Sequence, residues 1–299
     1  MADTPQLTAF SDSLADAVAK AGASVVTVHA RKRLPATGIA WAPDVVVTAE
    51  HVLERDDQIT VTLPDGKDAA ATIAGRDPGS DIAVLRIAGG ALTPIARGGE
   101  ARVGHLVLAV GRPGEGGPQA SLGSVVALGG PWRTFRGGHV EGYLRTGVTF
   151  YPGFSGGPLV DTVGAAIGLN SSRLGRGAGL TIPIAAVATI VDALLAGGRI
   201  KRGYLGLGSQ VIRLSAALAA KREGQETALL VTGVEPGSPA DSCGVLAGDI
   251  LVGATGQPLT DTDDLQQVLG PESVGKPLAL EVFRGGEPVS LAVTVGERG

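Results

Sequence analysis

Between residues 24 and 182 the chain repeats one pattern, a short run of β-branched and other apolar residues that ends near Gly, Pro or Asp. Val45-Val-Val-Thr and Leu106-Val-Leu-Ala-Val are two such runs. Short runs of this kind are typical of strands, and many of them joined by turns indicate a β-sandwich or a pair of β-barrels. The 47 Gly and 18 Pro among the 299 residues support many short strands, because the tight turns between strands use both residue types. The pattern predicts a mainly β fold.

The chain before this region has the periodicity of a helix. Leu7, Phe10, Leu14 and Val18 recur at spacings of three and four. This spacing predicts an amphipathic helix over residues 8–21, which Gly22 ends. We therefore expect a helical segment over 1–22 and a β domain over 23–198.

The chain after this region changes character again. Pro183 fits the first turn of a helix through 185–195, and Gly197 to Gly203 is the candidate linker. Helical patterns near 214–222 and 262–269 then alternate with short apolar runs. The pattern predicts a smaller, mixed α/β domain over 199–299.

The net charge and the cysteine content limit which partners and which cellular compartment are expected. The formal net charge is −4, so no basic excess favours nucleic acid or an anionic membrane. Cys243 is the only cysteine, which leaves no disulfide and no thiol pair for a metal, and we expect a small buried residue there. No apolar stretch reaches the roughly 20 residues that span a bilayer, and the first residues lack the basic start of a signal peptide. As written, the sequence predicts a cytoplasmic protein, or a periplasmic or secreted one if a signal or anchor has been removed.

Three short segments carry a constellation for nucleophilic catalysis. A serine hydroxyl needs a base to take its proton, a group that orients the base, and donors for the developing oxyanion. Ser155 stands among glycines in Gly153-Phe-Ser155-Gly-Gly-Pro-Leu, where an unusual turn can expose its hydroxyl. His51 follows one predicted strand, and Asp81 precedes another. We predict Ser155 as nucleophile, His51 as base and Asp81 as the orienting carboxylate.

The string Gly153-x-Ser155-x-Gly157 also fits the nucleophile elbow of α/β-hydrolases. In that fold the histidine follows the serine in the chain. The four histidines, His29, His51, His105 and His139, all precede Ser155. No base remains for an esterase of that type, whereas the order His, Asp, Ser is that of trypsin-like proteases.

The same three segments resemble the signature segments of the HtrA (DegP-type) family of trypsin-like serine proteases. They are Thr48-Ala-Glu-His51, Asp81-Ile-Ala-Val-Leu and Gly153-Phe-Ser155-Gly-Gly-Pro-Leu. The resemblance continues through Ile182-Pro into Arg202-Gly-Tyr-Leu-Gly-Leu. It implies two six-stranded β-barrels with the triad in the cleft between them, followed by a PDZ domain.

The resemblance also assigns further residues. The backbone N–H groups of Gly153 and Ser155 would form the oxyanion hole. The strand Leu169-Asn170-Ser171-Ser172 would pair with an extended substrate, and Leu169 with the segment from Tyr151 to Gly153 would border a pocket for a small aliphatic side chain. No cofactor and no metal is implied.

Two positions depart from the family pattern around the nucleophile. The family has Asn just before the serine and Asp about eight residues upstream, whereas this chain has Phe154 and Gly147. Phe150, Tyr151 and Phe154 cluster there, and we expect aromatic packing to replace the polar anchors. A catalytically weak or inactive protease-fold protein that holds peptides is the alternative to an active enzyme.

The start of the C-terminal domain resembles the carboxylate-binding loop of PDZ domains. That loop is Tyr204-Leu205-Gly206-Leu207, and backbone N–H groups in such a loop capture the carboxylate of a peptide C-terminus. The predicted helix after Asp263 would offer Leu265 and Leu269 to the terminal apolar side chain.

The sequence as a whole predicts an ATP-independent serine endopeptidase. The expected partners are unfolded or extended polypeptides at Ser155 and peptide C-termini at the PDZ domain. The apolar stripe with Phe10 fits either association of copies through the N-terminal segment or packing on its own barrel, and the resemblance implies a homo-oligomer, a homotrimer, formed through this segment. The segment 129–139 contains Arg and aromatic residues, but the acidic chain around it argues against nucleic acid. By the resemblance it is a sensor loop, and an inert surface loop is the alternative.

Overall fold

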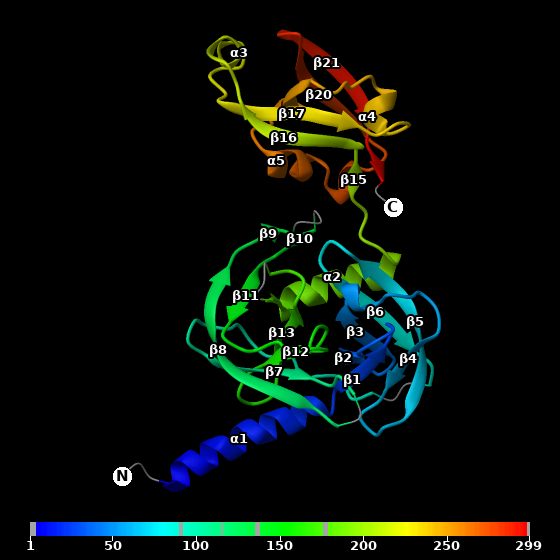
Figure 1. The fold of residues 1–299 in the computed structure, drawn as a ribbon, viewed down its shortest axis with the longest axis vertical. Coiled ribbons are helices and arrows are strands. Elements are labelled where there is room, and N and C mark those ends of the chain that lie inside the picture. The colour runs from blue at the N-terminus through cyan, green and yellow to red at the C-terminus, as the bar shows by residue number, and fades with distance from the viewer. Residues whose placement is uncertain (1–3, 90–91, 115, 135–137, 176–178, 298–299) are drawn as a thin grey trace. The chain divides into compact units, whose positions relative to one another are not determined.

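The computed structural model describes residues 4–89, 92–114, 116–134, 138–175 and 179–297, which form two compact units, Met1–Ile200 and Lys201–Gly299 (Figure 1). No helix in these ranges is long and apolar enough to cross a membrane. Each unit is described below by itself.

The first unit contains two closed six-stranded antiparallel barrels. The strand order of barrel 1 is β1-β2-β3-β6-β5-β4, and that of barrel 2 is β11-β14-β13-β12-β7-β8. Barrel 1 consists of β1 (Val25–His29), β2 (Ala36–Ala42), β3 (Val45–Ala49), β4 (Ile59–Thr62), β5 (Asp68–Asp77) and β6 (Ile82–Ile87). Barrel 2 consists of β7 (Leu106–Gly111), β8 (Gln119–Gly129), β11 (Tyr143–Thr146), β12 (Pro158–Val160), β13 (Ala166–Ser171) and β14 (Leu180–Pro183). The predicted pair of six-stranded barrels is confirmed.

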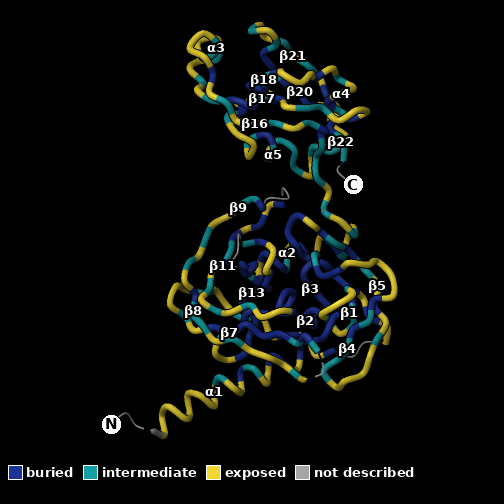
Figure 2. Tube along the Cα trace, in the orientation of Figure 1, coloured by how far each residue is buried: buried dark blue, intermediate teal, exposed yellow. Residues whose placement is uncertain are grey.

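The strands β1, β2 and β3 of barrel 1 are buried on both faces because they contribute to two cores. Side chains alternate across a strand, so Val46 of β3 points into the barrel, whereas Val45 and Val47 join a second core. That second core also holds Val110 and Leu169 of barrel 2. The two barrels therefore share one core, and the chain is largely buried where they meet (Figure 2).

Two helices complete the first unit. The helix α2 (Ile184–Gly197) packs its buried face on the core shared by the barrels. The helix α1 (Thr4–Gly22) packs only its last turns, through Ala17 and Ala21. Its first half leads away from the barrels (Figures 1 and 2), and Leu7 and Phe10 are 67% and 44% exposed.

Short elements connect the strands of the first unit. They are the 3-10 turn η1 (Glu50–Val52) and the hairpin strands β9 (Trp132–Arg133) and β10 (His139–Val140). Residues 135–137 of the predicted sensor loop lie outside the described residues.

The second unit is built on a twisted antiparallel sheet in the order β16-β17-β18-β20-β21. Its core residues come from the sheet and from the helix α5, which a capping box of Asp261 and Asp264 starts. The predicted small α/β domain is confirmed. The strands are β15 (Gly203–Tyr204), β16 (Leu207–Arg213), β17 (Thr227–Val234), β18 (Ile250–Ala254), β19 (Gln257–Pro258), β20 (Pro277–Arg284), β21 (Glu287–Thr294) and β22 (Gly296–Glu297). The helices are α3 (Ala216–Ala220), α4 (Pro239–Ser242), α5 (Thr262–Val268) and the 3-10 turn η2 (Pro271–Ser273).

Candidate active site

His51 and Asp81 are brought together by the pairing of β3 with β6. Ala49, the last residue of β3, is the register partner of Ile82, the first residue of β6. His51 follows β3 and Asp81 precedes β6, so both residues lie at the same end of these neighbouring strands. Asp81 has a φ of 59°, in the left-handed region that few non-glycine residues adopt. Residues in such conformations are concentrated at functional sites.

The Asp81 carboxylate is buried and fully bonded. Its two oxygens lie 2.9 and 2.8 Å from Nδ1 of His51, and Oδ1 also accepts from the backbone N–H of His51 at 3.0 Å. Oδ2 accepts from the hydroxyl of Ser171 as well. A carboxylate acceptor keeps the proton of His51 on Nδ1, which leaves Nε2 free to act as a base.

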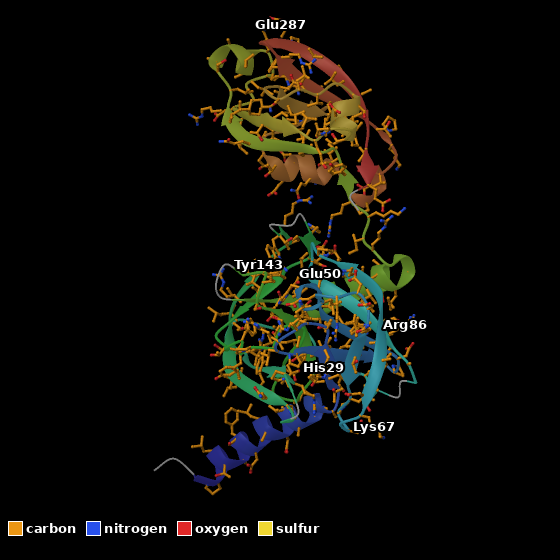
Figure 3. The ribbon with its side chains drawn as sticks, turned by 45° about the vertical axis from the view of Figure 1, so that its right-hand side comes forward. His29, Glu50, Lys67, Arg86, Tyr143 and Glu287 are labelled. Atoms are coloured by element: carbon orange, nitrogen blue, oxygen red, sulfur yellow. The ribbon has the colours of Figure 1, made fainter. Side chains whose placement is uncertain are left out.

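The turn that carries His51 is tied to barrel 1 by an ion pair. Glu50 is buried, and its Oε1 accepts from Nε of Arg76 at 3.1 Å and more closely from Nη2 (Glu50 is labelled in Figure 3). Arg76 also pairs with the exposed Asp56 at 2.5 Å. Glu50 is not among the site residues predicted from the sequence. The signal for it is a charged residue directly between a buried apolar run and the candidate base.

Ser155 lies in a turn between the barrels. Gly153 and Gly156 have φ angles of 88° and 85°, which glycine adopts without the strain that a Cβ brings. On the barrel 2 side, the N–H of Gly156 donates to Asn170 O, and Asn170 N donates to Gly157 O, each at 2.9 Å. On the barrel 1 side, Thr37 of β2 bonds the same turn.

Two amides of this turn have no protein acceptor within the described residues, those of Gly153 and Ser155. Between them, Phe154 N donates to Tyr151 O at 3.0 Å. Unpaired N–H groups in a glycine turn are suited to bind an anion. They belong to the two residues predicted to form the oxyanion hole.

The hydroxyl of Ser155 is bonded to Ser172 in this structure. The two Oγ atoms are 2.8 Å apart, and Ser172 N donates to Ser155 Oγ at 3.2 Å. In the part of the chain that is described, no hydrogen bond joins Ser155 Oγ to His51. Catalytic hydrogen bonds of free enzymes are often long and tighten when substrate binds.

Phe154 holds the turn by packing. Its side chain has no exposed surface and lies in the barrel 2 core beside Leu159, with its ring edge-to-face with Tyr151 at 5.5 Å. A Cβ built on Gly111 would lie 2.5 Å from the Phe154 ring. The aromatic packing expected around the nucleophile is therefore present.

The structure corrects part of the predicted substrate site. Leu169 and Asn170 have no exposed surface, and both backbone groups of Asn170 are already bonded to the turn. The prediction that they border a pocket and pair with substrate is wrong. The side chain of Leu169 lies in the core shared by the two barrels, and Oδ1 of Asn170 accepts from the buried hydroxyl of Thr181. Pairing of β13 with β12 and β14 occupies the backbone at its two edges. The side chain of Ser171 is buried too and donates to Asp81, whereas Tyr151 is half exposed.

Metal ligands do not cluster in the described ranges, where no group of three His, Cys, Asp or Glu side chains is placed to hold an ion.

The second unit presents an open strand edge beside a helix. The strand β16 is last in the sheet and pairs only with β17, and α5 packs beside it. The loop before β16 contains Leu205 and Gly206, whose N–H groups have no protein acceptor among the residues described. Gly206 has a φ of 78° and packs against Ser238.

The predicted side chains of this groove differ in exposure. Leu265 is buried in the core, and Leu269 and Leu207 are half-buried at its margin. The hydroxyl of Tyr204 is bonded to Glu235. The open edge, the free amides and the partly exposed leucines lie around one loop and one helix.

Comparison with known families agrees with this geometry. The family model of the trypsin-like peptidase domain matches residues 36–169, and that of the PDZ domain matches residues 230–284. The chain is 34% identical over 269 residues to a probable periplasmic serine endoprotease, DegP-like, of Pseudomonas savastanoi pv. phaseolicola, covering 87% of this chain and 55% of that protein. It is 34% identical over 258 residues to the periplasmic pH-dependent serine endoprotease DegQ of Escherichia coli, covering 84% and 56%. The chain thus spans about half the length of the curated relatives it matches.

Solved structures resemble the chain over nearly its whole length. An HtrA-type protease, AlgW, crystallised with a decapeptide, has a TM-score of 0.74 at 26% identity and covers 96% of this chain and 99% of its own. The serine endoprotease from Yersinia pestis gives a TM-score of 0.74 at 26% identity, with 96% and 98% covered.

Proposed function

The chain belongs to the HtrA/DegP family of trypsin-like serine proteases with a C-terminal PDZ domain, and from this premise we propose that it is a serine endopeptidase of unfolded or extended polypeptides. The observation that carries the proposal is the buried Asp81 carboxylate on Nδ1 of His51, in the same rigid unit as a serine turn with two unpaired amides. We assign His51, Asp81 and Ser155 as the triad, and the amides of Gly153 and Ser155 as the oxyanion hole.

The proposed reaction has two halves. Ser155 Oγ turns from Ser172 toward His51, attacks the peptide carbonyl and gives its proton to Nε2 of His51. The two amides bind the oxyanion of the tetrahedral intermediate. Its C–N bond then breaks, and the leaving amine takes the proton from His51.

Water completes the cycle. His51 takes a proton from the water that attacks the acyl-enzyme ester and returns it to Ser155 Oγ. The carboxylate of Asp81 stabilises the imidazolium that forms in each half.

The test is Ser155→Ala, with cleavage of denatured casein as the assay. Removing a member of a triad costs about 10⁴-fold or more in rate. An unchanged circular dichroism spectrum and melting temperature control for folding. Turnover of the variant within tenfold of the parent would reject the assignment.

A second candidate is a catalytically weak protein that holds peptides. The bond of Ser155 Oγ to Ser172, in place of His51, favours it. A fluorophosphonate probe distinguishes the two, because it reports an activated serine without a natural substrate. Peptide binding without any labelling would favour the holding function.

We assign peptide C-termini as ligands of the second unit. The carboxylate would accept from the amides of Leu205 and Gly206, and the peptide would add as a strand to β16. The structure of AlgW with a decapeptide supports a peptide ligand in a related protein. Fluorescence anisotropy of a labelled peptide with a free C-terminus, compared with its C-terminal amide, tests this. Equal affinity of the two would reject carboxylate capture.

We further propose a homotrimer formed through α1. Leu7 and Phe10 are apolar, exposed and on the half of α1 that leaves the barrels, and burying them between copies removes apolar surface from water. Light scattering of the parent and of Leu7→Ser/Phe10→Ser tests it. A monomer in both cases at micromolar concentration would reject it.

The two named relatives are called periplasmic, and we propose an extracytoplasmic location for this chain as well. Fractionation of the source cells tests it, with recovery only in the cytoplasm as the contrary result.

A further inference from the structure

Thr37 of β2 is fully buried at the contact between barrel 1 and the nucleophile turn. Its Oγ1 donates to Gly153 O at 2.7 Å, and its backbone N donates to Ser155 O at 3.3 Å. Its backbone O accepts from the hydroxyl of Thr48 at 2.7 Å. One residue of barrel 1 thus binds the carbonyl groups of the two residues whose amides form the proposed oxyanion hole.

The direction of the Thr37 hydroxyl is determined by its partners. Oγ1 also lies 2.9 Å from the backbone N of Arg112. A backbone N–H can only donate and a carbonyl can only accept. The single hydroxyl proton of Thr37 must therefore point at Gly153 O, while a lone pair accepts from Arg112.

This bond fixes the peptide unit that lies between the two proposed oxyanion donors. The unit joins Gly153 to Phe154; Thr37 binds its carbonyl oxygen, and Tyr151 O binds its N–H. With both ends bonded, the plane of the peptide cannot rotate freely. A rotated unit would bring the negative end of a carbonyl dipole toward the developing oxyanion and would displace the flanking amides.

The surrounding backbone permits little other adjustment. A Cβ on Gly153 would lie 2.5 Å from Pro113 Cβ, and one on Gly156 would lie 2.2 Å from Thr37 O. The turn is therefore packed closely against β2, and the Thr37 hydroxyl anchors its backbone from the barrel 1 side.

We propose that Thr37 is a positioning residue of the oxyanion hole, which its hydroxyl holds in the anion-binding arrangement. The family pattern leads one to expect a polar residue at position 154 in the turn itself, and here that position is an apolar core residue. The anchor is supplied across the barrel junction instead. This inference rests on the proposed protease function and adds a residue to its machinery.

The test compares Thr37→Val, which keeps the shape and loses the hydroxyl, with Thr37→Ser, which keeps the hydroxyl. Removing an oxyanion donor itself costs about 10²- to 10³-fold in kcat, so we expect the loss of its support to cost about 10- to 100-fold. KM should change less than about threefold, and Thr37→Ser should retain kcat within about threefold.

Thr27→Val is the matched control. Thr27 is the register partner of Thr37 on β1, is equally buried, and donates its hydroxyl to Arg112 O at 2.8 Å. The Thr27→Val variant loses a similar buried hydrogen bond, also to the backbone of Arg112, but Thr27 does not contact the nucleophile turn. We expect kcat within about threefold of the parent.

A transition-state readout separates positioning from general destabilisation. Thr37→Val should lower the affinity for a peptide boronate inhibitor by the same factor as it lowers kcat/KM, because both quantities report binding of the oxyanion. Binding of a substrate peptide to the Ser155→Ala protein should not change when Thr37→Val is added. Rates are normalised to the folded fraction from thermal melts, and Thr37→Ala replaces Thr37→Val if the latter does not fold.

Three results would overturn the inference. A folded Thr37→Val protein with kcat within threefold of the parent would do so, as would an equal loss in Thr27→Val or no rescue by serine. A parent that neither cleaves casein nor reacts with a fluorophosphonate would reject the protease function itself, and the inference with it.

Discussion

The packing of Phe154 on Gly111 gives a quantitative test of how the nucleophile turn is held. Phe154 is fully buried in the barrel 2 core, and truncation of such a side chain to alanine typically costs about 3 to 5 kcal/mol. For a unit of this size, about 200 residues, each kcal/mol corresponds to roughly 2 to 4 °C in melting temperature. Phe154→Ala should therefore lower the melting temperature of the first unit by about 6 to 20 °C.

Gly111→Ala should be harmful only while the ring is present. The added Cβ would lie 2.5 Å from Phe154 Cδ1, a contact that needs a shift of the ring and costs about 1 to 3 kcal/mol. Gly111 is not in the positive-φ region, so alanine brings no backbone strain there. In the Phe154→Ala protein the same change should be neutral or stabilising by about 0.5 to 1 kcal/mol.

The double-mutant cycle measures this difference. We expect a coupling free energy of about 2 kcal/mol between the two positions. Urea unfolding followed by tryptophan fluorescence suits the purpose, because Trp41 and Trp132 both lie in the first unit. Additive effects within about 0.5 kcal/mol, or a cost of Phe154→Ala below about 1 kcal/mol, would refute the packing argument.

Three further outcomes follow from single contacts. Ser172→Ala should raise the fluorophosphonate labelling rate about 2- to 10-fold, because Ser155 Oγ loses a competing hydrogen bond of about 0.5 to 1.5 kcal/mol; an unchanged or lower rate contradicts this. Arg284→Met should lower the unfolding free energy of the second unit at pH 7, as measured by urea titration. The hydrogen bonds of Arg284 hold the pKa of Asp249 below its ordinary value, so the stabilisation is present above about pH 4 and is lost as pH falls through the lowered pKa; a stability difference between parent and variant that does not shrink as pH falls below about 4 would argue against this. Gly206→Ala should weaken peptide binding to the second unit at least about tenfold, since its Cβ would lie 2.2 Å from a neighbouring side chain and its φ is positive; parental affinity by anisotropy would contradict it.

Features that depend on neighbours in the chain were readable from the sequence. The strand runs, the helix after Pro183 and the glycines around Ser155 each express a local preference of the backbone, and the structure has strands, a helix and a glycine turn at these places. The order of His51, Asp81 and Ser155 excluded an α/β-hydrolase for the same reason, since the order of residues is a property of the chain alone.

Features that depend on closure of the barrels were decided only by the tertiary structure. Leu169 belongs to an apolar run that fits a pocket wall or a core equally well, and packing of the two barrels against each other places its side chain in their shared core. Thr37 and Gly153 are 116 residues apart, and nothing near Thr37 in the sequence marks it as a partner of the turn. Ser171 meets Asp81 across 90 residues in the same way. The physical reason is that a hydroxyl finds its acceptor through space, at the junction of two packed barrels, whereas sequence patterns report only which face of a strand or helix a residue occupies.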